Sequence, residues 1–369
     1  MDDQWVTVAD AIKSNHIDVL HTAINQYIYT SNNQVTEFTD KYNQNILHIA
    51  VLYSDINTIS YIINHYPLLI NSVDHYSRTP LYHISSIRHI ELLCTNGANI
   101  NQQDNDGNTV LHILTQQNKL QLIDLLITQY DADADIINNK GQSILHISAQ
   151  YGYTELLELY IDKYRLDVNL IDSAGWSSLM YCSLGSWPQY ESHSECIQSL
   201  INHSANINHT DKQGMNALHV CTDSPAVRIL LQHNINPYAL DLQLHNPLYY
   251  TNAENTIIIL DYVELHDGID SVYKLVYQRD IYQRTILHSI TDSDKILVLQ
   301  RFNIDMNIID QFGKTALDYA IETQRGNIEL VLRKLGAQSN RYNYHKYIVF
   351  VLTGVLGIVT AKYIKQRHK

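Results

Sequence analysis

Apolar residues recur along this chain in blocks that share one pattern, and residues 141–160, GQSILHISAQYGYTELLELY, give the clearest example. Each block is anchored by a leucine, and successive anchors lie 34, 30, 34, 34, 39, 30, 39 and 30 residues apart. The anchors are Leu47, Leu81, Leu111, Leu145, Leu179, Leu218, Leu248, Leu287 and Leu317. A period of about 33 residues predicts supersecondary units that stack on one another and share a continuous core.

The polar residue two positions before each anchor predicts where a helix begins. It is Asn, Ser or Thr in every block, and the side-chain oxygen of these residues caps helices by accepting from their first N–H groups. The nine residues are Asn45, Thr79, Thr109, Ser143, Ser177, Asn216, Asn246, Thr285 and Thr315. We therefore expect the first helix of each unit to start directly after this residue.

The residues further upstream predict a tight turn ahead of that helix. Asp stands seven residues before the anchor in eight blocks, with Asn138 in the ninth: Asp40, Asp74, Asp104, Asp172, Asp211, Asp241, Asp280 and Asp310. Gly stands four residues before it in five: Gly107, Gly141, Gly175, Gly214 and Gly313. Because Gly adopts a positive φ easily, this pattern is typical of a turn, although Leu244 and Gln283 replace the Gly in two blocks.

A histidine follows the anchor in five blocks: His48, His112, His146, His219 and His288, with Asp318 in that place in the last block. Together these positions resemble D-x-x-G-x-T-x-L-H-x-A, the core of the ankyrin repeat, over about residues 40–338. The resemblance implies an all-α solenoid of paired antiparallel helices joined by β-hairpin-like turns, in which the histidine bonds neighbouring backbone. It implies nine repeats at residues 40–338 after a degenerate capping repeat at residues 1–39.

The unequal spacings predict where repeats lose or gain residues. In LYHISSIRHIELL, residues 81–93, the loss falls between the two helices. Extra segments lie at residues 185–195, where Pro188 predicts a loop, and at 264–278, which predicts an extra or extended helix. These inserts either contact a partner or act only as spacers, and the sequence is consistent with both roles.

Charge and cysteine content narrow the classes of partner. The formal net charge is −13, and residues 341–369 hold six Lys or Arg and no Asp or Glu, so residues 1–340 carry −19. We expect no nucleic-acid partner, because phosphate binding needs a basic surface. Cys94, Cys182, Cys196 and Cys221 form no CxxC pair, which indicates reduced thiols in a cytosolic body.

No catalytic motif stands out in the sequence. The GxxxxGK[ST], GxGxxG and GxSxG patterns do not occur, and neither does HExxH or a Cys/His ligand cluster. ESHSEC, residues 191–196, is better explained as a polar loop than as a metal site. We therefore expect no enzyme activity, no catalytic residue, no metal and no cofactor.

The resemblance implies that partners bind a concave face formed by hairpin tips and the ends of the first helices. Exposed aromatic residues and arginines are typical of interaction hot spots. The outward positions supply Tyr42, Tyr53, Tyr76, Arg78, Tyr151, Trp176, Tyr282, Arg284 and Phe312. Trp176 is the preferred candidate, because a Trp in a turn has little packing reason to be there. The alternative for each residue is packing against an adjacent hairpin.

The last residues, YIVFVLTGVLGIVTAKYIKQRHK, are apolar around the whole helix circumference and then basic. We expect a linker at residues 339–346, a transmembrane helix at 347–364 of about 27 Å and a basic tip at 365–369. The anchor residues would include Ile348, Phe350, Leu352, Leu356, Ile358 and Lys362. The alternative is a helix buried against the repeats. Thr353, Gly357 and Ala361 recur every four residues and allow weak self-association.

The sequence therefore predicts a non-enzymatic scaffold or adaptor that captures unknown protein partners at a cytosol-facing membrane. Its short, basic-flanked tail is similar to the tail anchors of the mitochondrial outer membrane, with the endoplasmic reticulum as a close rival, and the ankyrin body would be cytosolic. The alternative is a soluble ankyrin scaffold, or a pathogen-derived host-interaction effector, with the C-terminal helix buried.

Overall fold

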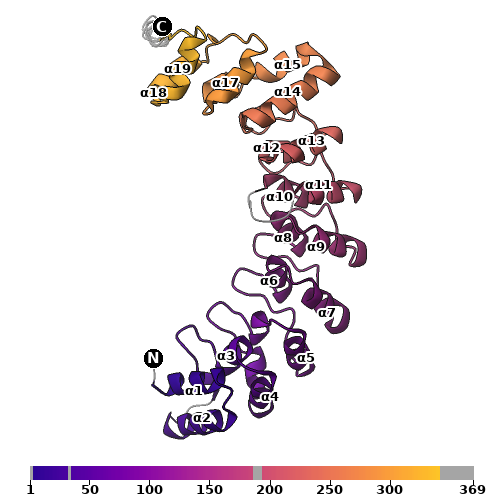
Figure 1. The fold of residues 1–369 in the computed structure, drawn as a ribbon, viewed down its shortest axis with the longest axis vertical. Coiled ribbons are helices and arrows are strands. Elements are labelled where there is room, and N and C mark those ends of the chain that lie inside the picture. The colour runs from indigo at the N-terminus through magenta and orange to yellow at the C-terminus, as the bar shows by residue number, and fades with distance from the viewer. Residues whose placement is uncertain (1–2, 32–34, 186–192, 341–369) are drawn as a thin grey trace, which may run out of the picture. The chain divides into compact units, whose positions relative to one another are not determined.

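The computed structural model describes residues 3–31, 35–185 and 193–340, and these are helices joined by short turns (Figure 1). Extended pairing in these ranges is limited to two isolated bridges, Thr39 with Asn45 and Ile171 with Ser177. The prediction of an all-α fold made from repeated helix pairs is therefore confirmed.

The chain divides into two compact units, of which the first ends at Ser178 and the second begins at Leu179. The helices of the first unit are α1 (Asp3–Lys13), α2 (Ile17–Ser31), η1 (Val35–Glu37), α3 (Ile46–Tyr53), α4 (Ile56–His65), η2 (Pro67–Asn71), η3 (Pro80–His83), α5 (Ile87–Thr95), α6 (Val110–Gln116), α7 (Leu120–Tyr130), α8 (Ile144–Tyr151), α9 (Thr154–Glu158) and η4 (Leu159–Lys163). From the unit boundary onward they are α10 (Ser178–Leu184), α11 (His193–Asn202), α12 (Ala217–Val220), α13 (Ser224–Gln232), η5 (Pro247–Tyr249), α14 (Ala253–Asp267), α15 (Ile269–Val276), α16 (Ile286–Ser289), α17 (Ser293–Gln300), α18 (Ala316–Glu322) and α19 (Gly326–Lys334).

The first helix of each repeat begins where the capping residue predicts. The side chains of Asn45, Ser143, Asn216 and Thr315 accept from backbone N–H groups in the first turn of the helix that each precedes. Thr79 and Ser177 are exceptions, because their buried hydroxyls have no hydrogen-bond partner in the part of the chain that the structure describes. These caps satisfy donors that the helix itself leaves unpaired.

The anchor leucines form the core of the stack. All nine are buried, with at most 3% of any one exposed. In the first unit α3 packs against η3 and α6 against α8, and in the second unit α13 packs against α14 and α17 against α19. Because burying a leucine side chain contributes about 1.5–3 kcal/mol, contacts between neighbouring repeats supply much of the stability.

The 30-residue spacings shorten the first helix of a repeat. It is a single 3-10 turn in η3 and four residues long in α12 and α16. Side chains from the following repeat then bond the carbonyls that such a short helix leaves open. The Asn255 amide donates to the carbonyls of Cys221 and Thr222, at 3.3 and 3.2 Å.

Two basic residues act in the same way further along the second unit. The Lys295 ammonium donates to the carbonyls of Leu248 and Thr251, at the end of η5, and Arg325 donates to the carbonyl of Ile290 after α16. Lys295 is buried, and this burial lowers the pKa of its ammonium to about 8. Side chains of the next repeat therefore replace intrahelical hydrogen bonds that the short helices lack.

The insert at 264–278 is both an extended and an extra helix, as predicted: α14 continues to Asp267 and α15 follows at Ile269. No helix within residues 3–31, 35–185 and 193–340 is long and apolar enough to cross a membrane. The predicted C-terminal apolar helix at 347–364, with the anchor residues Ile348 to Lys362, lies outside the described residues. So does most of the insert at 185–195.

Candidate functional site: the hairpin row

Each turn between repeats is folded around one carboxylate or amide oxygen. Asp280 Oδ1, for example, accepts from the backbone N–H groups of Tyr282 and Arg284, both at 2.8 Å. The same pair of hydrogen bonds forms at Asp40, Asp74, Asp104, Asn138, Asp172, Asp211, Asp241 and Asp310. These bonds give all nine hairpins one shape and explain why Asp recurs seven residues before the anchor.

The residue four positions before each anchor has a positive φ in all nine hairpins, whether or not it is Gly. Leu244 has φ 66° and Gln283 has φ 60°, so the turn forms without the glycine that its geometry favours. A leucine in this region is strained by about 1–2 kcal/mol. The Asp-centred bonds therefore hold the turn against local preference at these two positions.

Neighbouring hairpins are joined edge to edge by backbone hydrogen bonds. In the first unit the N–H of His75 donates to the carbonyl of Tyr42 at 2.9 Å, and that of Asn105 donates to Tyr76 at 2.9 Å. In the second unit the N–H of Gln311 donates to the carbonyl of Tyr282 at 3.2 Å. We call each such series of tips a hairpin row. Its tips are residues 41–42, 75–76, 105–106, 139–140 and 173–174 in the first unit, and 212–213, 242–243, 281–282 and 311–312 in the second.

The five repeat histidines fix each hairpin to the helix before it. In His146, Nδ1 accepts from the N–H of Ser143 at 3.2 Å, so the proton is on Nε2, which donates to the Trp176 carbonyl at 3.2 Å. His48, His112, His219 and His288 bond in the same way. Burial lowers the pKa of all five imidazoles and favours the neutral form that this bonding needs. The structural role implied by the resemblance is therefore confirmed.

Asp318 replaces this histidine in the last repeat. It accepts hydrogen bonds on both sides, whereas the histidine accepts on one side and donates on the other. Its Oδ2 accepts from the N–H of Thr315 at 2.9 Å, as an imidazole Nδ1 would. Its carboxylate also accepts from the N–H of Asn340 at 3.1 Å and from the Ser339 hydroxyl. Burial opposes its ionisation, but these hydrogen bonds keep the pKa of Asp318 below its usual value. A carboxylate fits here because it meets donors where the other repeats present a carbonyl.

The structure places two of the predicted partner residues on adjacent tips of the first unit, with a third, Arg78, beside them. Tyr42 and Tyr76 are exposed, and the Arg78 guanidinium lies 5.3 Å from the centre of the Tyr76 ring. Arg78 is also half-buried and pairs with the Asp104 carboxylate at 3.3 Å. The arginine therefore orients the ring and the neighbouring hairpin, and its charge is already matched within the fold.

A second group of three lies in the row of the second unit. Tyr282 and Phe312 are exposed on adjacent tips, and the Arg284 guanidinium lies 4.8 Å from the Tyr282 ring centre. Arg284 Nε donates to the Asp280 carboxylate at 2.7 Å. Although burial opposes it, this bond and those from backbone N–H groups lower the pKa of Asp280. The aromatic rings, rather than the arginines, are the parts left open to a partner.

The other three predicted residues lie apart from these groups. Trp176 is half-buried, and its carbonyl accepts from Asp172 N–H at 2.9 Å as well as from His146. Tyr53 and Tyr151 are the last residues of α3 and α8. Tyr53 is exposed with the Lys13 ammonium 5.5 Å from its ring centre, whereas Tyr151 stacks on Tyr153 at 5.6 Å.

Two exposed aliphatic residues on the second row were not predicted from the sequence, because only aromatic residues and arginines were considered there. Leu242 and Ile281 are exposed at tips next to Tyr282, and Leu242 is 73% exposed. Both stand six residues before an anchor, which is one of the outward positions. An apolar residue at that position in two successive repeats is the signal that identifies them.

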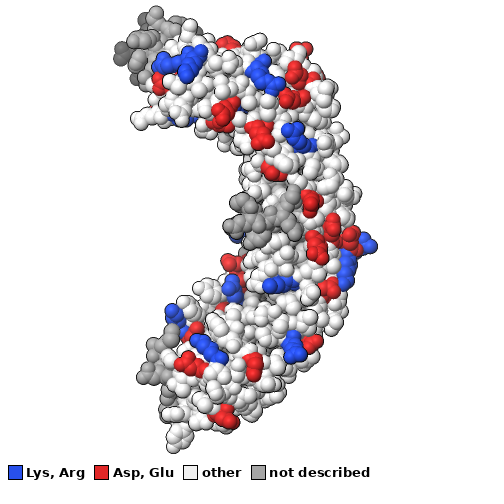
Figure 2. All heavy atoms as spheres, in the orientation of Figure 1, with Lys and Arg blue, Asp and Glu red and all other residues white. Residues whose placement is uncertain are grey.

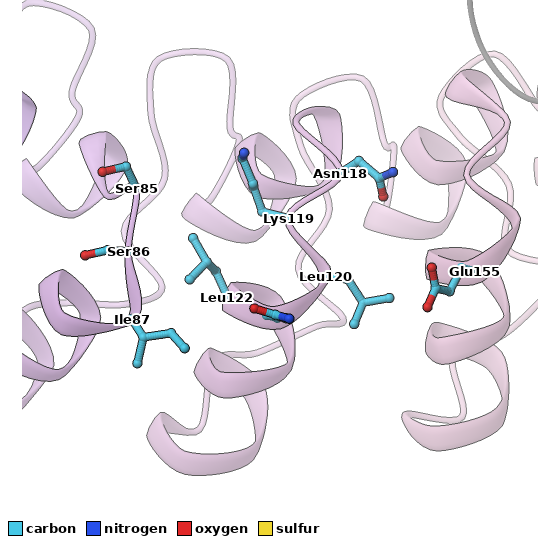
Figure 3. A pocket seen from close by; sticks show the side chains of 9 residues that line it. Ser85, Ser86, Ile87, Asn118, Lys119, Leu120, Leu122 and Glu155 are labelled. Carbon is cyan, nitrogen blue, oxygen red and sulfur yellow. The ribbon is translucent and has the colours of Figure 1, made fainter.

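A hollow of about 460 Å³ lies beside the shortened helix η3, away from the hairpin row (Figure 3). Ser86 and Ile87 at the start of α5 line one side and the start of α7 lines the other. Figure 3 shows Leu122 turned toward Ser86 and Leu120 toward Glu155. Lys119 and Glu155 are exposed and carry opposite charges, so the hollow favours no single charge of ligand.

Charged groups offer no metal site in the part of the chain described, and no broad basic surface on the face that Figure 2 draws. No group of three or more His, Cys, Asp or Glu residues there is placed to hold a metal ion. On the face drawn in Figure 2, Lys and Arg lie singly or in small groups among Asp and Glu. All four cysteines are free thiols, and Cys182, Cys196 and Cys221 are buried.

Comparison with known proteins supports the repeat assignment. A family model described as ankyrin repeats in three copies matches residues 8–104, 85–172, 111–191 and 155–241. No curated protein matches the chain. Among solved structures, the crystal structure of the ankyrin repeat domain of Bcl-3, "a unique member of the IkappaB protein family", is similar with 20% identity and a TM-score of 0.41, covering 69% of this chain and 97% of that one. Because the family model covers more than half of its length, the chain belongs to the ankyrin-repeat family.

Proposed function

We propose that this protein is a non-enzymatic scaffold that binds a protein partner along its hairpin rows. The main support for this proposal is two pairs of exposed aromatic residues, Tyr42 with Tyr76 and Tyr282 with Phe312. They lie on tips that backbone hydrogen bonds hold at fixed spacing. Rigid aromatic side chains provide contact area with little loss of conformational entropy on binding. We treat residues 40–338 as nine binding repeats and residues 1–39 as their N-terminal cap.

Quantitative affinity capture from cells tests this function. The full chain is compared with Tyr282→Ala, Phe312→Ala and Tyr76→Ala, and with the control Leu68→Ala. Leu68 is 76% exposed on η2, outside the hairpin row. Each row variant should lose at least tenfold of one shared set of captured proteins while its melting temperature stays unchanged. Equal capture by all four variants and the wild type would contradict the proposal.

The membrane anchor is a finer proposal that rests on the sequence of residues 347–364 alone. Anchoring would confine the scaffold to two dimensions and raise its effective concentration for partners at the same membrane. A scaffold without an anchor, including a host-interaction effector, accounts for the described residues at least as well. Carbonate extraction of the full chain, beside a chain stopped at Asn340, separates the two. Pelleting of the full chain alone supports the anchor, whereas two soluble proteins would remove it together with self-association through Thr353 and Gly357.

A further inference from the structure

Helix α14 is longer than the helices that flank it. It has 15 residues, whereas α13 has 9 and α17 has 8. Ser224 Oγ, on the first residue of α13, donates to Asn255 Oδ1, on the third residue of α14, at 2.7 Å, so these two positions lie level. From that level α14 runs four residues further than α13, or about 6 Å of helix. Leu265 lies on this extension and is 80% exposed.

A groove of about 300 Å³ runs between α13 and the extended α14. Arg228 and Leu231 line it from α13, and Ile257, Asp261, Tyr262 and Leu265 line it from α14. Residues 257, 261 and 265 follow one another at four-residue spacing, so the lining continues for about 12 Å along one helix face. That length matches two turns of a partner helix whose apolar residues recur at three- and four-residue spacing.

Acidic residues predominate along α14 and the start of α15 beside this groove, although its α13 wall carries Arg228. From Ala253 to Tyr273 the sequence has five acidic residues and no Lys or Arg. Glu254, Glu264 and Asp270 are exposed and have no ion-pair partner within residues 193–340, while Asp261 pairs with Arg301 at 3.3 Å. On the opposite wall Arg228 is exposed and also lacks an ion-pair partner there.

We propose that the groove binds an amphipathic helix of a partner protein, with its apolar stripe over Ile257 and Leu265 and Lys or Arg residues facing α14. The apolar lining supplies the hydrophobic contact, and the unpaired carboxylates select a basic flank. This site goes beyond the proposed function, because it lies on paired helices rather than on hairpin tips. A scaffold with both sites can hold two partners at once.

The test uses the full chain and two synthetic helices of about 14 residues, both with leucine at i, i+4 and i+7. One carries Lys at the remaining positions and the other carries Glu. In fluorescence anisotropy the Leu/Lys peptide should bind at least tenfold more tightly than the Leu/Glu peptide. Leu265→Gln should weaken binding of the Leu/Lys peptide about tenfold, whereas Leu242→Gln, an equally exposed leucine on a hairpin tip, should leave it unchanged.

A matched charge reversal tests which wall faces the basic flank. Arg228→Glu should strengthen Leu/Lys binding more than Arg88→Glu does, because Arg88 is an exposed arginine on α5 that lies outside the groove. Equal effects of Leu265→Gln and Leu242→Gln, or of the two arginine reversals, would mean non-specific attraction to an acidic protein and would overturn the proposal. Tyr282→Ala and Phe312→Ala should not change peptide binding, so failure of either site can be told from failure of the other.

A photo-crosslinker attached through Leu265→Cys identifies the occupant. The chain without this substitution is the control for labelling at Cys94, which is half-buried and whose pKa burial raises to about 11. Crosslinking to the Leu/Lys peptide, suppressed by excess unlabelled peptide, is the expected result. If the crosslinks found without peptide join two copies of the chain, or reach residues 341–369, the groove is filled by the protein itself and the assignment to a partner is wrong.

Discussion

Replacing His83 with Phe should stabilise the protein, and the gain should grow as the pH falls. His83 ends the short helix η3 and is half-buried, and its Nε2 has no hydrogen-bond partner within residues 3–31, 35–185 and 193–340. Its ring lies edge-on to His48 with 5.9 Å between ring centres. Burial, aided by His48, lowers the pKa of His83 from 6.5 to about 4.

The size of the effect follows from this shift. Because the folded state resists protonation and the unfolded chain does not, stability is full above pH 6.5 and falls as the pH drops from 6.5 toward about 4. pH 5 lies 1.5 units below the ordinary histidine pKa of 6.5. At about 1.36 kcal/mol per unit, the folded state is therefore destabilised by about 2 kcal/mol at that pH. Phenylalanine does not titrate, so His83→Phe should remove about 2 kcal/mol of the loss between pH 7 and pH 5.

Urea unfolding at pH 7 and pH 5, followed by tryptophan fluorescence, measures this difference. All proteins carry Trp187→Phe, so that the signal comes from Trp5 and Trp176, which belong to the first unit. The control is His75→Phe, since His75 is exposed on a hairpin tip. Wild type and the control should lose the same stability between the two pH values, while His83→Phe loses about 2 kcal/mol less. An identical loss in all three proteins would show that His83 protonates freely in the folded state, which would refute the reasoning.

Four further substitutions test other parts of the fold. Leu145→Ala should lower the free energy of unfolding by about 2–5 kcal/mol, and an unchanged urea midpoint would put the repeat register in doubt. Leu244→Gly should raise stability by about 0.5–1 kcal/mol by relieving its positive φ, whereas Gly214→Leu should lower it because a Cβ there lies 3.0 Å from the Leu240 carbonyl. Between pH 8 and pH 10 wild type should gain stability relative to Lys295→Met, because the buried Lys295 ammonium, with its pKa lowered to about 8, loses its proton more readily than in the unfolded chain. Thermal unfolding of both proteins across this pH range measures the difference, and parallel pH profiles would contradict it.

The sequence predicted the parts of the fold that local patterns encode. The caps such as Ser143, the Asp-centred turns and the buried anchors all lie within about seven residues of one another, so a single repeat carries the whole signal. The turn at Leu244 shows the limit of this reasoning. The missing glycine suggested a departure from the motif, yet hydrogen bonds to Asp241 impose the same conformation.

Features that join one repeat to the next were not predictable in the same way. Lys295 bonds carbonyls 44 and 47 residues earlier in the chain, and no local pattern distinguishes it from an ordinary surface lysine. Arg78 and Arg284 were expected to face partners, but Asp104 and Asp280 already engage them. The groove beside α14 depends on the relative lengths of two helices, so only the extra length of that segment was visible beforehand.

Site-specific photo-crosslinking in cells tests the central claim, that the hairpin rows bind a protein partner, most directly. A crosslinking amino acid is placed in the full chain in place of Tyr76, Tyr282 or Phe312 on the rows, or in place of Leu68 on η2, a control that is more exposed than any of the three. The account predicts that the three row positions crosslink to peptides of the same partner or partners and that the control does not. Crosslinks from the control position alone, or an equal and diffuse pattern from all four, would contradict it.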